Sequence, residues 1–154
     1  MRKLFFFLFS TIIFSSGFTQ PKADQAYNLS GKQLALEGYD PVSYFLKNKA
    51  IKGQSSITAV DNGITYQFES LSNKNTFLTN PSRYEPQYGG WCAYAMGASG
   101  EKVEVDPETF KIVNGKLYLF YNRFFNNTLK SWNKDESALM KKADMNWLKL
   151  YPQH

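Results

Sequence analysis

Cysteine and histidine are almost absent from this sequence. Its 154 residues include one cysteine, Cys92, and one histidine at the last position. A single thiol excludes an intrachain disulfide framework, a CxxC redox pair and a four-cysteine zinc site. A single histidine at the end of the chain excludes metal sites built from several histidines and argues against a Ser-His-Asp triad. The scarcity of these two residues therefore removes many classes of catalytic and metal site.

Basic residues are not concentrated in one part of this chain. The formal net charge is +5, yet the lysines are scattered among acidic residues. Residues 130–154, for example, hold five lysines and three acidic residues, which is the composition of a solvated surface. A nucleic-acid-binding domain carries clustered basic side chains, so we expect no nucleic-acid partner. The sequence also shows no internal repeat and no low-complexity tract.

The one long apolar run lies at the amino terminus. Residues 1–3 are Met-Arg-Lys, residues 4–14 are mostly apolar, and residues 15–20 are mostly small or polar. This three-part pattern is typical of a secretory signal peptide, and the run is shorter than the roughly 20 residues that span a bilayer. We therefore predict a signal peptide over residues 1–19, a periplasmic or secreted mature chain, and no membrane contact after cleavage. An uncleaved anchor is the alternative.

The mature chain is predicted to form one small domain of the α+β class over residues 34–154, preceded by a loose segment over residues 20–33. Two Asn-Gly pairs favour tight turns, because both central positions of such turns need positive φ. Alternating apolar residues flank each pair, as in a strand with one buried face. The sequence therefore predicts two β-hairpins, over residues 57–68 and 110–121.

Short helices and one long amphipathic helix complete the predicted domain. Pro41 can open a helix over residues 42–46, because the N–H that proline lacks has no partner in a first turn. Ser72 is predicted to cap a helix that Asn80-Pro81 ends. Apolar residues at helical spacing predict an amphipathic helix over residues 135–151. The remaining predicted elements are a strand over 34–36, a helix over 93–96, an exposed strand over 102–105 and a turn at 106–107.

Cys92 is the residue that raises the question of chemistry. It follows Gly89-Gly90 and is expected near the first turn of a short helix, where peptide dipoles stabilise a thiolate. One hypothesis is therefore a single-thiol redox module in which Cys92 is the catalytic residue and exchanges with an outside redox partner. The alternative is that Cys92 packs as a small buried hydrophobic residue, as free cysteines often do.

Met96 lies four residues after Cys92, so on one helix the two sulfur atoms would share a face. A thiolate and a thioether suit a soft ion such as Cu(I). A second hypothesis is therefore a copper-binding accessory protein with Cys92 and Met96 as metal ligands and a metal-delivery partner. Two ligands are few for a strong site, and methionine on an apolar face often only fills a core.

Aromatic residues crowd the sequence around Cys92. A third hypothesis is a non-catalytic module in which these rings form a shallow pocket for a ligand or a partner, while Cys92 merely packs. A hydrophobic core also accounts for them. The residues concerned are Tyr84, Tyr88, Trp91 and Tyr94.

Several segments of the chain together resemble a known family. They are GYDPVSYF (residues 38–45), Tyr66-x-Phe68, NPSRYEPQYGGWCAYAM (residues 80–96), DPETF (residues 106–110) and GKLYL (residues 115–119). This pattern resembles the exported bacterial branch of the YHS domain, known as YHS domain-containing (seleno)proteins. The resemblance covers roughly residues 34–147, and the Gly-Gly-aromatic-Cys-Ala-Tyr segment is its most specific part.

The resemblance carries two implications about chemistry. Some members of the branch have selenocysteine at the position matching Cys92, which implies a nucleophilic or redox role for this residue. The resemblance to the wider YHS group implies metal binding, with copper as the candidate metal, through two cysteines, and the matching positions here are Glu69 and Asn73. Because both thiols are replaced, the metal site of the wider group does not carry over to this chain, and no cofactor other than copper is expected.

Overall fold

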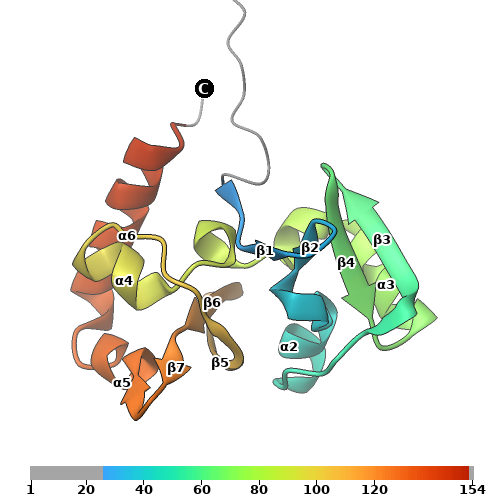
Figure 1. Cartoon of the computed structure of the whole chain (residues 1–154), viewed down its shortest axis with the longest axis horizontal. Coiled ribbons are helices and arrows are strands. Elements are labelled where there is room, and N and C mark those ends of the chain that lie inside the picture. The colour runs from blue at the N-terminus through green and yellow to red at the C-terminus, as the bar shows by residue number, and fades with distance from the viewer. Residues whose placement is uncertain (1–25, 153–154) are drawn as a thin grey trace, which may run out of the picture.

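The computed structural model describes residues 26–152 and combines a four-stranded mixed β-sheet, two further two-stranded hairpins and several helices (Figure 1). The predicted α+β class is confirmed. The expected signal peptide over residues 1–19 lies outside the described residues. Within residues 26–152, no helix has both the length and the apolar composition needed to cross a bilayer.

The amino-terminal half is built on a four-stranded sheet in the order β1-β2-β4-β3. Strands β1 and β2 are antiparallel, β2 and β4 are parallel, and β3 and β4 form the predicted hairpin around Asn62-Gly63. Helices α2 and α3 pack against this sheet. The bounds are β1 (Leu29–Ser30), β2 (Leu34–Ala35), η1 (Leu36–Gly38), α2 (Pro41–Lys47), β3 (Gln54–Asp61), β4 (Ile64–Phe68), α3 (Leu71–Thr79) and η2 (Pro81–Arg83).

The carboxy-terminal half contains the second predicted hairpin and the long helix. Helix α4 packs against α6, and a glycine inside α4 permits this contact, because a Cβ on Gly97 would lie 2.5 Å from the Leu139 carbonyl oxygen. The predicted amphipathic helix is confirmed as α6. The bounds are η3 (Gln87–Gly90), α4 (Ala93–Ala98), β5 (Asp106–Val113), β6 (Lys116–Phe120), β7 (Asn122–Arg123), β8 (Asn126–Asn127), α5 (Thr128–Trp132) and α6 (Glu136–Leu150).

The prediction that the chain has no internal repeat is wrong. Hairpins β3–β4 and β5–β6 turn at Asn62-Gly63 and Asn114-Gly115, which are 52 residues apart. Their registers correspond throughout: Gln54 pairs with Phe68 in the first hairpin, as Asp106 pairs with Phe120 in the second, and the same register shift follows in each.

The repeat extends to the helices that precede the hairpins. Asp40 is the N-cap residue of α2 and Cys92 is the N-cap residue of α4. The backbone N–H of Asp40 donates to the Ile51 carbonyl at 2.8 Å, and that of Cys92 donates to the Val103 carbonyl at 2.9 Å, again 52 residues later. We call residues 34–70 the first repeat and residues 86–122 the second repeat. In Figure 1, α2, β3 and β4 lie on the right, whereas α4 lies further to the left.

Few residues are identical between the two repeats. The two repeats share a glycine before the first helix and an Asn-Gly-x-x-Tyr-x-Phe pattern in the hairpin, and elsewhere the corresponding residues differ. The identical positions in the first repeat are Gly38, Asn62, Gly63, Tyr66 and Phe68. Backbone geometry is therefore repeated, as is the burial of the shared tyrosine and phenylalanine, while the remaining side chains have diverged.

Two predicted element boundaries need correction. Helix α3 is capped by Ser70, whose hydroxyl oxygen accepts the Asn73 N–H at 3.1 Å, rather than by Ser72. The helix begins at Leu71, which is 64% exposed, so the hydrophobic pattern gave no sign of this first turn. Residues 101–105 form no strand, and Asp106-Pro107 begins β5 rather than a turn, because the preceding segment is hydrogen-bonded to Cys92 instead of to a sheet.

The segment expected to be loose, residues 20–33, is bound to the domain from residue 26 onward. The N–H of Asn28 donates to the Gly89 carbonyl at 2.8 Å, and the indole N–H of Trp91 donates to the Ala26 carbonyl at 3.0 Å. A Cβ on Gly89 would lie 2.3 Å from the Ala26 oxygen. The Gly-Gly pair thus allows the amino-terminal segment to approach, which polarity alone did not reveal.

The buried hydrophobic residues form two clusters. The larger includes Tyr44, Phe68 and Cys92, and spans both repeats. The smaller includes Met96 and Trp132, and packs α4 and α5 against α6. The two candidate sulfur ligands therefore belong to different clusters.

Candidate functional site

Cys92 lies immediately before α4, not within its first turn, and its side chain is fully buried. The Tyr121 N–H donates to the Cys92 Sγ at 3.4 Å, and the Thr128 hydroxyl oxygen lies 3.4 Å from the same sulfur. The Thr128 hydroxyl donates to the Tyr121 carbonyl at 2.9 Å, so the thiol hydrogen is the donor toward Thr128. The thiol is therefore held by two weak contacts from the residues that flank the β7–β8 hairpin.

An open pocket of about 290 Å³ lies against Cys92. Small and polar residues line most of it: Cys92, Tyr94, Ala95, Ala98, Ser99, Val103, Tyr121, Asn126 and Thr128. None of these carries a full charge, so no cation in this lining faces the sulfur. Because the thiol has no exposed surface, a reagent in this pocket reaches it only when the residues that cover it move.

Met96 and Cys92 do not form a shared sulfur face. Met96 is buried inside α4, whereas Cys92 has non-helical φ and ψ of −58° and 115°. The i, i+4 rule holds only when both residues are helical, which explains why the two side chains pack in different clusters. Within residues 26–152, no three His, Cys, Asp or Glu side chains lie close enough to hold a metal ion.

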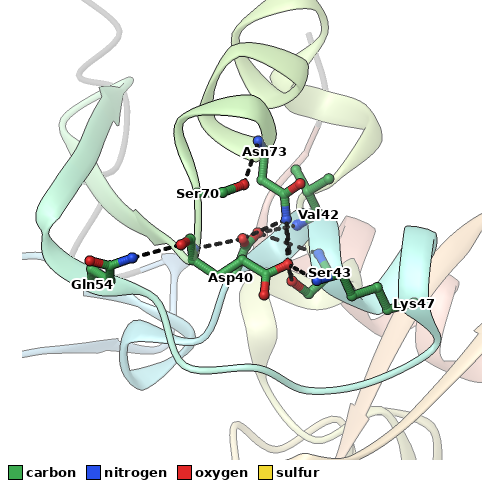
Figure 2. Close-up of polar contacts among 8 residues, drawn as sticks. Asp40, Val42, Ser43, Lys47, Gln54, Ser70 and Asn73 are labelled. Atoms are coloured by element: carbon green, nitrogen blue, oxygen red, sulfur yellow. Dashed lines mark hydrogen bonds and ion pairs between the residues drawn. The ribbon is translucent and has the colours of Figure 1, made fainter.

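Asp40 occupies the position in the first repeat that Cys92 occupies in the second, and it too is fully buried. Figure 2 shows the polar contacts around it. Its Oδ1 accepts the N–H of Val42 at 2.8 Å and of Ser43 at 3.3 Å. Its Oδ2 accepts the Glu69 N–H at 2.9 Å and the Asn73 amide at 2.8 Å. Four donors compensate the desolvation of this carboxylate without a cation, so its role is to join α2, β4 and α3.

Glu69 and Asn73 lie side by side in this network. The Asn73 amide donates to Glu69 Oε1 at 3.1 Å, the Ser43 hydroxyl donates to the same oxygen at 3.1 Å, and Lys47 Nζ lies 2.6 Å from it. The Lys47 ammonium lowers the pKa of Glu69 below its ordinary value, while partial burial opposes this effect. The carboxylate is thus committed to partners within the chain.

Two turns with left-handed backbone conformation are a third candidate for a functional feature, after Cys92 and the Asp40 network. Leu36, Glu37 and Gly38 have φ of 54°, 49° and 81°, and the corresponding residues 88–90 of the second repeat have φ of 54°, 60° and 84°. Consecutive left-handed residues are costly for L-amino acids, so the surrounding structure must hold them in place. In the second repeat, the Tyr88 hydroxyl donates to Asp144 Oδ1 at 2.9 Å and fixes the turn to α6.

A cleft of about 260 Å³ lies between the two left-handed turns. It is lined by Tyr27, Asn28, Leu29, Ser30, Ala35, Leu36, Glu37, Lys52, Tyr66, Pro86, Gly89, Gly90, Glu104, Val105, Pro107 and Leu119. Three charged residues belong to this lining: Glu37, Glu104 and Lys52. Lys52 Nζ donates to the Glu37 backbone carbonyl at 2.6 Å, and Arg123, outside the lining, lies 3.8 Å from Glu104. The cleft therefore offers hydrogen-bonding groups on an apolar base, and its charges sum to zero only when Arg123 is counted.

Burial keeps the phenols at this cleft protonated. Burial raises the pKa of Tyr27 and of Tyr66, and the charge of Glu85 raises both further. The Tyr66 hydroxyl donates to Glu85 Oε1 at 3.5 Å. Burial also raises the pKa of Glu85 itself, and Asp61 adds to this effect. Tyr27 and Tyr66 thus act as hydroxyl donors rather than as bases.

Sequence reasoning found the Gly-Gly motif but not the cleft. Of the aromatics expected to stack on a ligand, Tyr84 and Tyr88 are buried in the core, while Tyr94 lines the pocket beside Cys92. The cleft combines residues from both repeats and from the amino-terminal segment, which no local pattern brings together. The repeated glycine at Gly38 and Gly90, each ending a left-handed turn, was the one available signal.

Comparison with protein-family models, with curated proteins and with solved structures finds no match to this chain. The resemblance to the YHS group therefore stays a prediction from sequence motifs. Function must be inferred from the geometry of the chain itself.

Proposed function

We propose that this chain is an exported YHS-type domain that binds a small molecule in the cleft between its two repeats. The observation that carries this proposal is the convergence of both left-handed turns on one cavity. Strained backbone persists where the surrounding structure maintains it, and it is common at ligand sites. The second turn lies within a motif segment that supports the family resemblance, and Gly38 of the first turn opens another.

The ligand should be small, uncharged and rich in hydrogen-bonding groups. The volume of about 260 Å³ lies just below the usual range for ligand pockets, which begins at roughly 300 Å³. Tyr27, Asn28 and Ser30 supply polar groups, and Leu36 and Leu119 supply apolar surface. Because Lys52 and Arg123 balance Glu37 and Glu104, neither an anion nor a cation is favoured. A monosaccharide, polyol or small amide fits these conditions.

Thermal denaturation of the mature chain with a panel of small molecules tests this proposal. Uncharged polyols, sugars and amides should raise the melting temperature, whereas small carboxylates and amines should not. Tyr27→Phe removes a cleft hydroxyl and should weaken the shift. Tyr94→Phe removes a similarly half-buried hydroxyl outside the cleft and should leave it unchanged. An absence of any shift, or equal shifts in both variants, would contradict the proposal.

A single-thiol exchange module is the second candidate, because Cys92 lines a pocket and its two contacts are weak. In this reaction the Cys92 thiolate attacks a disulfide of a partner, forms a mixed disulfide and releases one partner thiolate. A second thiol of the partner then attacks the mixed disulfide and restores Cys92, so no further oxidant is needed.

Native mass spectrometry after incubation with oxidised glutathione tests this candidate. A glutathione adduct should form on the folded chain and be absent from Cys92→Ala. Urea-unfolded chain serves as the control for intrinsic reactivity. If the adduct forms only after unfolding, Cys92 is a packing residue.

A further inference from the structure

Hairpin β7–β8 differs in its turn from the two Asn-Gly hairpins. Hairpins β3–β4 and β5–β6 each place Asn-Gly at the two positive-φ positions of the turn. Hairpin β7–β8 places Phe124 and Phe125 there, with φ of 51° and 67°. Bulky aromatic residues are outliers in this region of backbone space. The turn chemistry is therefore not what favours phenylalanine at these positions.

The hairpin is also an insertion relative to the first repeat. There, only Glu69 and Ser70 separate β4 from α3, whereas residues 121–127 separate β6 from α5. Phe124 is 89% exposed and Phe125 is fully exposed, and neither belongs to a core cluster. The two rings contribute nothing to packing within the domain, so their apolar surface is available to a partner.

The charge around the tip has one sign along the chain. Residues 122–134 include Arg123, Lys130 and Lys134 and contain no acidic residue. Arg123 lies 3.8 Å from the exposed Glu104, so the positive charge of this segment rests mainly on Lys130 and Lys134. An exposed apolar tip in a segment with basic residues and no acidic residue is complementary to an anionic lipid surface.

We propose that the β7–β8 hairpin docks this protein on an anionic bilayer, with Phe124 and Phe125 inserted among the lipids. Two phenylalanines offer roughly 150–250 Å² each, well below the roughly 800 Å² that each partner buries in a stable protein interface. A bilayer needs no such matching surface, because it closes around an inserted side chain. This inference departs from our expectation that the mature chain has no membrane contact, and it requires no membrane-spanning helix.

Co-sedimentation of the mature chain with vesicles tests the proposal. Vesicles of phosphatidylglycerol and phosphatidylcholine should pellet the protein, pure phosphatidylcholine should pellet at least fivefold less, and added salt should reduce binding. The variant Phe124→Asn/Phe125→Gly installs the turn pair of the two Asn-Gly hairpins, so it should fold and yet lose at least fivefold in binding. Lys130→Gln/Lys134→Gln should lose binding more moderately.

A matched control variant and a second measurement distinguish insertion of the two phenylalanines from nonspecific adsorption to vesicles. Leu46 and Leu71 are 62% and 64% exposed and lie away from the hairpin, so Leu46→Ser/Leu71→Ser should bind vesicles as the parent does. Tryptophan emission of Phe124→Trp should shift to the blue on anionic vesicles. The proposal is overturned if the parent stays in the supernatant, if the Asn-Gly variant binds undiminished, or if the control loses binding equally.

Discussion

The two repeats place different side chains at the same point of the fold. Asp40 and Cys92 each precede a short helix, each is fully buried, and each accepts the N–H of the residue that follows the hairpin, Glu69 or Tyr121. Asp40 accepts four hydrogen bonds, whereas Cys92 makes two contacts of 3.4 Å. The residue at this position of the fold is thus held by four hydrogen bonds in the first repeat and by two weak contacts in the second.

This difference bears on how Cys92 is interpreted. Its contacts are the counterparts of structural contacts around Asp40, so they do not by themselves indicate catalysis. Their weakness nonetheless leaves the sulfur less constrained, and a pocket lies beside it. The comparison therefore favours the cleft as the ligand site and leaves thiol exchange as the second proposal.

Replacing Asp40 and Cys92 in turn should give the largest difference in stability between the two repeats. Asp40→Ala leaves four buried or partly buried donors without an acceptor, and we expect a loss of about 4 kcal/mol in unfolding free energy. Cys92→Ala removes one buried sulfur and should cost about 1–2 kcal/mol. Urea denaturation followed by circular dichroism measures both. Equal losses would mean that the second repeat depends on its thiol as strongly as the first depends on its carboxylate.

Substitutions in the two left-handed turns should give the next largest difference in stability between the repeats. Gly89→Ala should cost about 2–3 kcal/mol, because its Cβ would collide with the Ala26 carbonyl oxygen. The corresponding residue in the first repeat is Glu37, also left-handed, and Glu37→Gly should be neutral or slightly stabilising. Thermal denaturation of both variants checks this. A harmless Gly89→Ala would show that the docking of residues 26–28 is dispensable.

A smaller difference in stability depends on pH. Glu85, just before the second repeat, is acidic, whereas the corresponding position 52 residues earlier is the uncharged Gln33. Burial raises the pKa of Glu85 in the folded chain, so its ionised form destabilises the fold. The loss of stability is absent below about pH 4.5, the ordinary pKa of a glutamate side chain. It is complete above the raised pKa that Glu85 has in the folded chain. Glu85→Gln should therefore stabilise the protein at pH 7 and lose this advantage at pH 4. An advantage that persists unchanged at pH 4 would point to a cause other than charge.

The turn of the β7–β8 hairpin should show the smallest effect on stability. Phe124→Asn/Phe125→Gly replaces two strained positions with the pair found in both Asn-Gly hairpins, and we expect a gain of about 1 kcal/mol. Chemical denaturation measures it. A marked loss would show that the two rings support the fold after all.

Local chemistry made several elements predictable. The two Asn-Gly turns and the Asp40-Pro41 helix start are set by backbone preferences that act within a few residues. The long helix over residues 136–150 follows from a repeated apolar spacing. The cap of α3 was misplaced by two residues, because Ser70 and Ser72 both offer a hydroxyl that can cap a helix, and only the folded chain shows that Ser70 does so.

Sequence by itself determined the α+β class, both Asn-Gly hairpins and the long helix, because each depends on interactions between near neighbours. Only the tertiary structure decided the internal repeat, the burial of Cys92, the cleft between the two left-handed turns and the exposure of Phe124 and Phe125. The reason is physical: these features depend on which distant backbone segments meet, as when Ala26 reaches Gly89, and few identical side chains mark those meetings.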